Sequence, residues 1–301
     1  MQVAPKIKHL EPFPRPPNFQ VLSLQSVLRW LSESKSVKFL TKPSTGPAMS
    51  QPMAIVLPIT TINVSALKAS CSACSMHQLC LPMGLGESDI HKLDQIIGRR
   101  RKVPKDTLLY RMDDPFTNLY AIRLGHFKTY QVSPSGDQLV TGFQMAGELL
   151  GMDAISTDRH HCDAMALEDS EVCEIPFARL EELFGTIPAL LHHFHRMMSQ
   201  EITREQSVML LLGNMRAEQR FAAFLVNLSS RYAARGYSPA IFQLRMSREE
   251  IGNYLGLTIE SISRLLSRLK KQGLIRVANR EIELLDPIRL RAMAAGTEFC
   301  D

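Results

Sequence analysis

The sequence contains no run of about 18 or more apolar residues, the length at which a stretch becomes a candidate membrane-spanning helix. Its first twenty residues contain five prolines and no apolar stretch long enough for a signal peptide. We therefore expect a cytoplasmic location and no membrane partner. In that reducing compartment the six cysteines are expected to be metal ligands, redox groups or buried thiols rather than disulfides.

The sequence also has no glycine-rich nucleotide or flavin fingerprint before any expected helix. This absence argues against a redox enzyme, and we expect a protein that is not an enzyme. The composition is otherwise ordinary for a globular protein, with 45% hydrophobic and 22% charged residues, which excludes disorder over the whole chain. A length of 301 residues suggests about two domains.

Positive charge is concentrated in the C-terminal third of the chain. Residues 215–280 contain twelve Lys and Arg against four Asp and Glu, a net charge of +8, which leaves −3 for the rest of a chain whose total is +5. A basic module of this kind is typical of a protein that binds a polyanion such as DNA. A solvated surface can carry the same charge, so the concentration of Lys and Arg indicates DNA binding only together with a structural motif.

Five segments are expected along the chain. Residues 1–52 hold eight of the seventeen prolines, which predicts a disordered extension with a short helix near residues 21–31. The composition changes at Met53, which is a second candidate for the natural start. The other expected segments are a cysteine-rich stretch at 53–96, a β-roll at 97–186, a dimerisation helix at 187–213 and a winged helix-turn-helix at 214–301.

Short apolar stretches with glycine-containing corners predict the β-roll. The expected strands are residues 119–125, 127–132, 138–143 and 170–175, with a hairpin turn at 133–137. We expect Tyr110, Tyr120 and Tyr130 in the core of the roll rather than in a cofactor site. The histidines at 160–161 and 192–195 are expected to be ordinary polar residues rather than a second metal site.

The long helix is predicted to form the interface of a homodimer. Pro188 suits its first turn, and residues 189–212 contain no Gly or Pro. Positions 191, 195, 198, 202, 205, 209 and 212 follow alternating spacings of four and three and hold mainly apolar residues, which is typical of a coiled-coil seam. Packing on the chain's own roll is the alternative. The residues expected to mediate dimerisation are Leu191, Met198, Ile202, Glu205, Met209 and Leu212. A second phasing retains Glu205 and replaces three positions, with Phe194 for His195, Glu201 for Ile202 and Val208 for Met209.

The most informative segment is an expected helix-turn-helix. Ser247 and Glu250 form a capping box that begins a helix, Gly256 suits the sharp turn, and Thr258 caps a second helix over residues 259–272. Two strands of a β-wing are expected at residues 274–277 and 281–285.

The second helix has residue types that read the edges of bases in the major groove of DNA. Arg264 has the donors for guanine, Glu260 can accept from cytosine N4, and Ser263 can bind a base edge or a phosphate. The alternative is that Glu260 and Arg264, four residues apart, pair on an exposed helix face. The residues expected to contact DNA are Thr258, Glu260, Ser261, Ser263 and Arg264.

Three cysteines, Cys71, Cys74 and Cys80, lie within ten residues. Thiolates in such a loop suit an iron–sulfur cluster or zinc, and their spacing does not distinguish the two. Unliganded thiols are a further alternative. A fourth ligand has to come from elsewhere in the chain, and the candidates are Cys162, Cys173 and Cys300.

From Cys71 to Leu285 the chain closely resembles the Crp/Fnr family of bacterial transcription regulators, and within it the oxygen-sensing branch of fumarate and nitrate reduction regulators. The motifs that carry the resemblance are CSACSMHQLC, LYAIRLGHFKTY, GDQLVTGFQMAGELLGMDAIS, VCEIPF and IGNYLGLTIESISRLL. The resemblance implies an α+β fold with a β-roll sensor domain, similar to cupins and cyclic-nucleotide-binding domains, then a long dimerisation helix and a winged helix-turn-helix. It also implies an activator that works with RNA polymerase.

The resemblance further implies one oxygen-labile 4Fe–4S cluster per subunit, held by three N-terminal cysteines and one that follows the roll. By position these are Cys71, Cys74, Cys80 and Cys173, whereas Cys162 and Cys300 match no ligand of the family. Its base-reading residues match Glu260, Ser263 and Arg264, which implies palindromic DNA sites with TTGAT-like halves.

Glu205 matches an acidic position that the resembled family uses to keep the cluster-free protein monomeric. Two such carboxylates about 4 Å apart in a parallel dimer repel by about 1–4 kcal/mol. We expect an intact cluster to offset this repulsion and oxygen to reverse it, which gives an oxygen-responsive regulator of anaerobic metabolism genes. The alternative is a zinc-stabilised or cluster-free regulator of the Crp type that does not sense oxygen.

Cyclic nucleotide is not an expected ligand. The related cyclic-AMP receptors hold the nucleotide phosphate through an Arg–Ser pair shortly after a Gly–Glu in the roll. Gly147-Glu148 is present in this chain, but residues 154–163 lack the pair, so the phosphate has no bidentate partner.

Overall fold

The computed structural model describes residues 70–297, all of which belong to one compact unit, Ile62–Asp301. The expectations for residues 1–52, for the helix near 21–31 and for Met53 lie outside the described residues, as does Cys300. Within residues 70–297, no helix is long and apolar enough to cross a membrane.

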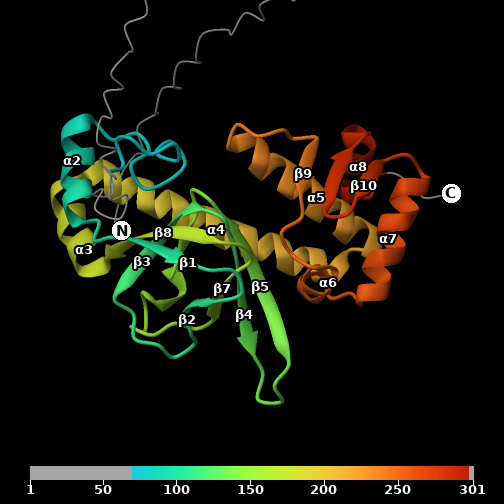
Figure 1. Cartoon of the computed structure of the whole chain (residues 1–301), viewed down its shortest axis with the longest axis horizontal. Coiled ribbons are helices and arrows are strands. Elements are labelled where there is room, and N and C mark those ends of the chain that lie inside the picture. Colours follow the sequence, from blue (N-terminus) through green and yellow to red (C-terminus); the bar gives the residue numbers. More distant parts are fainter. Residues whose placement is uncertain (1–69, 298–301) are drawn as a thin grey trace, which may run out of the picture. The chain divides into compact units, whose positions relative to one another are not determined.

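The first half of the described chain is a β-roll of two antiparallel four-stranded sheets, as expected (Figure 1). The order of strands is β1-β8-β3-β6 in one sheet and β2-β7-β4-β5 in the other. The bounds are β1 (Arg100–Val103), β2 (Leu108–Tyr110), β3 (Asn118–Leu124), β4 (His126–Val132), β5 (Gln138–Met145), β6 (Leu149–Leu150), η2 (Met152–Ala154, a 3₁₀ turn), β7 (Asp163–Ala166) and β8 (Ser170–Pro176). The four strands expected from the sequence are β3, β4, β5 and β8.

Inward-facing side chains of both sheets form the core of the roll. Phe127 and Val172 are fully buried there. The expectation that tyrosines belong to this core is confirmed for Tyr110 and Tyr120, which are only 5% and 8% exposed. Tyr130 is also buried, at 3% exposed, but it belongs to the apolar cluster that the roll shares with the C-terminal part of the chain. The expected turn closes the β4–β5 hairpin through the Ser133 N–H, which donates to the Asp137 carbonyl at 2.9 Å.

Two helices that the sequence did not indicate, α2 (Glu87–Ile96) and α3 (Phe177–Thr186), pack beside the roll. Leu93 of α2 and Leu180 of α3 are fully buried in one apolar core. Each helix is only ten residues long, which is too short for a clear sequence period.

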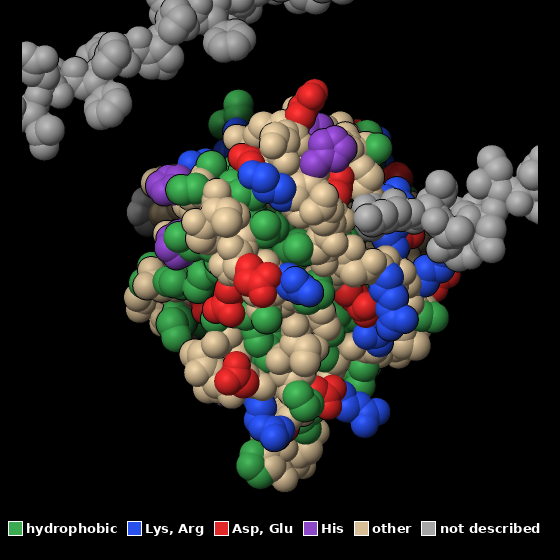
Figure 2. Space-filling view, turned by 90° about the vertical axis from the view of Figure 1, so that its left-hand side faces the viewer, with side chains coloured by type: hydrophobic (Ala, Val, Ile, Leu, Met, Phe, Trp, Pro, Cys, Tyr) green, Lys and Arg blue, Asp and Glu red, His purple; other side chains and the backbone are tan. Residues whose placement is uncertain are grey.

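On the face shown in Figure 2, acidic and basic side chains are interspersed, and neither sign of charge dominates.

The long helix expected at residues 189–212 is α4 (Pro188–Asn214), with Pro188 in its first turn. It leads from the roll to the C-terminal helices (Figure 1). Its first part packs on its own roll, where Leu190, His193 and Phe194 are buried. Its second part leaves large apolar side chains exposed, with Ile202 53% and Met209 73% accessible. The alternative, packing on the chain's own roll, is therefore realised in the first part of the helix, and dimerisation through the second part stays a prediction.

The C-terminal part contains the expected helix-turn-helix and wing. Its elements are α5 (Ala217–Ala234), β9 (Ile241–Gln243), α6 (Arg248–Leu255), α7 (Ile259–Lys271), β10 (Ile275–Ala278), β11 (Glu281–Leu284) and α8 (Pro287–Ala295). The capping box of Ser247 and Glu250 is formed, and Gly256 has the φ of 62° that the turn between the two helices requires. Strand β9 and helix α8 were not expected; β9 completes a sheet of order β10-β11-β9.

Glu148, in the turn between β5 and β6, is surrounded by three arginines. Its carboxylate accepts hydrogen bonds from Arg231 at 2.6 Å and Arg235 at 2.7 Å, both from α5, and Arg204 of α4 lies 3.6 Å away. Burial alone would raise the pKa of Glu148, but the three guanidinium groups outweigh it and lower the pKa from 4.5 to about 2. One carboxylate thus joins the roll, the long helix and the first C-terminal helix.

Glu148→Gln is expected to destabilise the fold in a pH-dependent manner. Because the folded-state pKa lies below the unfolded value, the contribution of Glu148 is complete above about pH 4.5 and is lost as the pH falls towards 2. A shift of this size corresponds to about 3 kcal/mol. Urea denaturation should therefore give a free energy of unfolding about 3 kcal/mol lower for the variant at neutral pH, and the difference should shrink below pH 4.5.

The control is Glu182→Gln, which removes a carboxylate that is 67% exposed on α3. An exposed ion pair contributes little, so this variant should differ from the native protein by less than about 1 kcal/mol at every pH. If the effect of Glu148→Gln is the same at pH 3 as at pH 7, the charge on Glu148 is not the source of the stabilisation.

Candidate functional site

The four cysteines that the family resemblance selects line a single cavity. Cys71, Cys74 and Cys80 come from the loop before α2, and Cys173 comes from β8. The rest of the wall is mainly apolar, with Leu81, Leu93 and Ile175 among its residues. Within residues 70–297, no three His, Cys, Asp or Glu side chains lie close enough together to hold a single metal ion.

The other two candidate cysteines are not part of this cavity as the structure describes it. Cys162 is buried elsewhere in the roll, with its Sγ 3.5 Å from Oδ2 of Asp153, and Cys300 lies beyond the described residues. Cys173 is fixed by its strand, because β8 pairs with β1 and β3 and places Cys173 opposite Arg100 and Ala121. The assignment of Cys173 as the fourth ligand remains a prediction, and its position favours it.

The cysteine loop is held at both ends by side chains from helices. At its start, the backbone N–H of Cys71 donates to Oδ1 of Asp94 on α2 at 2.5 Å. At its end, Nε2 of His193 on α4 lies 3.1 Å from the carbonyl oxygen of Cys80. Sequence reasoning missed both residues: Asp94 belongs to an unexpected helix, and the histidines of α4 were expected to be ordinary polar residues.

The acidity of the thiols shows what the site requires. Burial raises the pKa of Cys80 to about 12 and that of Cys173 to about 11. Burial also raises the pKa of Cys71, and the nearby Cys80 and Asp94 raise it further. These three thiols are therefore protonated at neutral pH in the absence of a cation. Cysteine binds a metal as the deprotonated thiolate, so iron or zinc would displace the thiol protons on binding.

The donor set of the cavity suits an iron–sulfur cluster. All four donors are sulfur, the ligand type that iron–sulfur clusters use, and no Asp or Glu lines the cavity.

The helix α7 has one buried and one exposed face, as expected. Ile262, Leu265, Leu266 and Leu269 are buried, whereas Glu260 and Arg264 are exposed and border a shallow surface hollow together with Ser263. Nε of Arg264 donates to the backbone carbonyl of Glu260 at 3.4 Å. Thr258 caps the helix, because its Oγ1 accepts from the N–H of Ser261 at 3.2 Å. The contacts of these residues with DNA stay a prediction.

The predicted dimer seam of α4 is partly covered and partly open. Leu191 and Met198 are half-buried, whereas Ile202, Glu205, Met209 and Leu212 are exposed. The alternative phasing is less compatible with an interface, because Phe194 is buried in the chain's own core and Glu201 is paired with Arg204 at 2.9 Å. Leu210, 61% exposed, adds an apolar side chain that the seam did not include.

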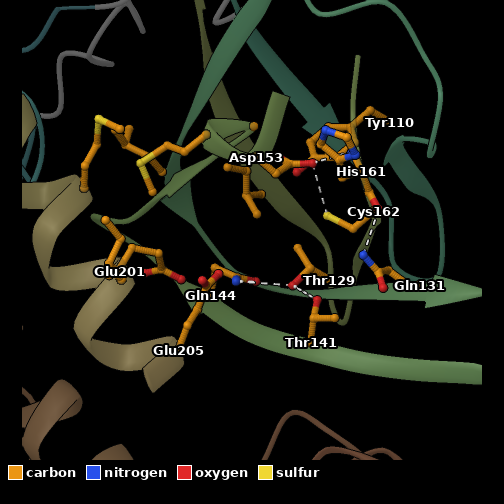
Figure 3. Close-up of a pocket in the computed structure, with 16 residues that line it drawn as sticks. Tyr110, Thr129, Gln131, Thr141, Gln144, Asp153, His161, Cys162, Glu201 and Glu205 are labelled. Atoms are coloured by element: carbon orange, nitrogen blue, oxygen red, sulfur yellow. Dashed lines mark hydrogen bonds between the residues drawn. The ribbon is translucent and has the colours of Figure 1, made fainter. Parts of the chain in front are cut away.

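A second cavity, of about 310 Å³, lies between the roll and α4 (Figure 3). Asp153 of the roll and Glu201 and Glu205 of α4 contribute carboxylates to its wall, and none of its lining residues is Lys or Arg. Glu148, in the motif that resembles a nucleotide site, is instead bound to arginines. The electrostatics of this cavity disfavour a phosphate.

Comparisons with known proteins place the chain in a family. A model of the cyclic nucleotide-binding domain matches residues 100–186, and one of the Crp-like helix-turn-helix domain matches residues 219–293. The transcriptional regulatory protein btr of Bordetella pertussis is 46% identical over 79% of this chain and 98% of its own length. The fumarate and nitrate reduction regulatory protein of Salmonella typhimurium is also 46% identical, over 79% of this chain and 96% of its own length. The chain belongs to the Crp/Fnr family of transcription regulators.

Other Crp/Fnr relatives give the same result. The transcriptional activator protein anr of Pseudomonas aeruginosa is 45% identical over 78% of this chain and 97% of its own length. Among solved structures, FixK2 from Bradyrhizobium japonicum aligns with a TM-score of 0.60 and 30% identity, covering 64% of this chain and 96% of that chain. The Crp-like fold and the expectation of a non-enzymatic regulator are thereby confirmed.

We predict that Arg264→Ala reduces the ability of the protein to distinguish between DNA sequences. One bidentate contact to a base contributes about 1–3 kcal/mol of discrimination, so the preference for a palindromic TTGAT-like site over its variant at the contacted base pair should fall by about tenfold or more. Fluorescence anisotropy with both DNA duplexes at fixed salt measures the ratio.

Lys271→Ala is the matched control, because Lys271 is also exposed on α7 but lies at its C-terminal end. It should weaken both duplexes equally, if at all, and leave their ratio unchanged. An Arg264→Ala protein with the native ratio would remove Arg264 from the base-reading set.

Proposed function

We propose that this regulator is controlled by oxygen. It binds palindromic DNA with TTGAT-like halves as a homodimer while one 4Fe–4S cluster per subunit is intact, acts with RNA polymerase on anaerobic metabolism genes, and works in the cytoplasm. Oxygen degrades the cluster, and the protein then returns to monomers and releases DNA. The observation that carries this proposal is the convergence of Cys71, Cys74, Cys80 and Cys173 on one cavity.

The chemistry of the cysteine site supports an iron–sulfur cluster. When bound, the cluster supplies iron–sulfide bonds that oxygen can attack. The chain supplies the four thiols, and an apolar wall that includes Leu81 and Ile175 limits the access of water. The name of the Salmonella relative, a fumarate and nitrate reduction regulatory protein, agrees with a role in anaerobic regulation.

The exposed half of α4 supports a dimer whose formation is conditional. Ile202, Met209 and Leu212 offer an apolar stripe to a second copy, but Glu205 lies in the same stripe. In a parallel pair the two Glu205 carboxylates would face each other, and their repulsion of about 1–4 kcal/mol at about 4 Å keeps the association weak. A rearrangement of the roll and α4 around an intact cluster would offset that cost.

Cyclic nucleotide is not the signal in this proposal. The cavity between the roll and α4 presents Asp153, Glu201 and Glu205 and no Lys or Arg, so its electrostatics disfavour an anionic ligand. Glu148 is held by Arg231 and Arg235 and is not free to bind a ribose.

A second candidate function is a cluster-free or zinc-stabilised regulator of the Crp type that does not sense oxygen. The four thiols around one cavity are also the donor set of a structural zinc site, which favours this candidate. Protein purified without air decides between the two. A brown protein with iron and sulfide that loses DNA binding in air supports the oxygen sensor, and a colourless protein that binds DNA equally in air supports the alternative.

Cys173→Ala is expected to abolish cluster binding, because it removes the donor that faces the cysteine loop from β8. After anaerobic reconstitution, the visible absorbance and the iron and sulfide content should fall to a small fraction of the native values. Cys162→Ala is the matched control, because it removes another thiol of the roll, one that is buried outside the cavity. This variant should retain the native iron and sulfide content. Full iron and sulfide in Cys173→Ala would move the fourth ligand elsewhere.

Glu205→Gln should dimerise in air without the cluster, because it removes the paired negative charges and keeps the shape of the side chain. Relief of about 1–4 kcal/mol lowers the dimer dissociation constant of the cluster-free protein by about five- to several-hundredfold. Sedimentation velocity over a concentration series measures this constant. Glu182→Gln, an exposed acid of α3, should leave the protein monomeric. A folded Glu205→Gln protein that remains monomeric in air would contradict the switch.

A further inference from the structure

His193 differs from its neighbours on α4. It is 5% exposed, whereas His192 and His195 on either side are exposed. Its Nε2 lies 3.1 Å from the carbonyl oxygen of Cys80, a residue 113 positions earlier in the chain. The side chain of His193 therefore crosses from the long helix to the cysteine loop.

The partner atom determines how this contact works. A carbonyl oxygen only accepts hydrogen bonds, so Nε2 of His193 has to carry the proton and donate it. Nδ1 is buried and has no hydrogen-bond partner among the described residues. The contact is directional, and it joins α4 to the backbone of the loop at Cys80, so it leaves the thiol of Cys80 free to bind.

This is the one hydrogen bond between the cysteine loop and α4 in the part of the chain that the structure describes. The start of the loop is held separately, by Asp94 on α2. Apolar packing also joins the loop to α4, because Leu81 shares a buried core with Leu190 and Phe194. Packing of this kind tolerates small displacements, whereas a hydrogen bond weakens steeply once its distance and angle change.

His193 is also well placed along α4 to influence the exposed stripe. At 1.5 Å per residue, Ile202 lies about 14 Å further along the helix and Glu205 about 18 Å. A helix is stiff over that distance, so a shift or rotation at His193 reaches both residues. Cys80, whose carbonyl accepts this hydrogen bond, is also one of the four proposed ligands, so a change at the cysteine site acts directly on the backbone that His193 holds.

We propose that His193 is a positioning residue that couples the cysteine site to the dimerisation helix through its hydrogen bond to the Cys80 carbonyl. Displacement of the loop on cluster binding moves or breaks this bond, and α4 changes its position on the roll in response. His193 is not a ligand of the cluster in this proposal. The inference rests on the proposed function, because it assigns the route by which the cysteine site controls the exposed stripe.

The test compares variants that separate the hydrogen bond from the bulk of the side chain. His193→Leu fills the buried space but cannot donate, and His193→Gln keeps an amide N–H donor. His192→Leu is the matched control, because it makes the same change at the exposed neighbour. Each full-length protein is reconstituted without air, its iron and sulfide are measured, and its dimer dissociation constant is determined before and after exposure to air.

In the native protein, the ratio of the dimer dissociation constant after exposure to air to that before exposure measures how strongly the cysteine site controls dimerisation. We expect His193→Leu to load iron and sulfide like the native protein, because the four thiols are unchanged, and to reduce that ratio by about five- to tenfold, the effect of one lost hydrogen bond. His193→Gln should restore most of the ratio, and His192→Leu should not alter it. A native ratio in His193→Leu, or a reduced ratio in His193→Gln equal to that in His193→Leu, would overturn the proposal.

A second measurement keeps the proposal testable without a cluster. In metal-free protein, hydrogen exchange of the backbone amides in residues 76–85 should be about five- to tenfold faster in His193→Leu than in the native chain, while the strands of the roll exchange at the native rate. Unchanged exchange at 76–85 would show that His193 does not hold the loop. A native protein that never binds iron contradicts the proposed function instead, and the exchange result still decides whether His193 connects the loop to α4.

Discussion

The pairing of β8 on both of its edges is the constraint on which the cysteine site depends. Hydrogen bonds to β1 and β3 fix the position of Cys173, while the other three thiols are carried by a loop of turns between Cys71 and Cys80. One donor on a strand that is paired on both edges therefore faces three donors on a loop of turns. In the proposed function, this difference means that the loop and the helices that hold it take up any change in the distance between donors.

The long helix serves two structural purposes along its length, and its burial changes accordingly. Near Pro188 it completes the core of the roll through Leu190 and Phe194, whereas beyond Met198 the same stripe is open. The three arginines around Glu148 add a polar counterpart to this arrangement, since they come from both α4 and α5. The roll, the long helix and the DNA-binding domain thus share contacts in which charge and apolar packing act together.

Much of this architecture could be predicted from the sequence because local signals agree with the fold. The capping box of Ser247 and Glu250 and the turn at Gly256 are determined by neighbouring residues, and they formed as expected. Helices α2 and α3 were missed because ten residues give too short a period, and β9 because it has only three residues. The roles of Asp94, Glu148 and His193 depend on partners that are distant in sequence, and no local pattern indicates which carbonyl or guanidinium group a buried side chain will meet.

The arginine cage around Glu148 has a consequence for attempts to re-engineer the sensor. The related cyclic-AMP receptors have a Gly–Glu before the residues that hold the phosphate. This chain has the same dipeptide at Gly147-Glu148, but the Glu148 carboxylate accepts hydrogen bonds from Arg231 and Arg235. Grafting an Arg–Ser pair into the neighbouring loop would therefore supply only half of a nucleotide receptor. Freeing the glutamate would first require neutral substitutes for both arginines, and that exchange would loosen the attachment of the DNA-reading module that a new ligand is meant to govern.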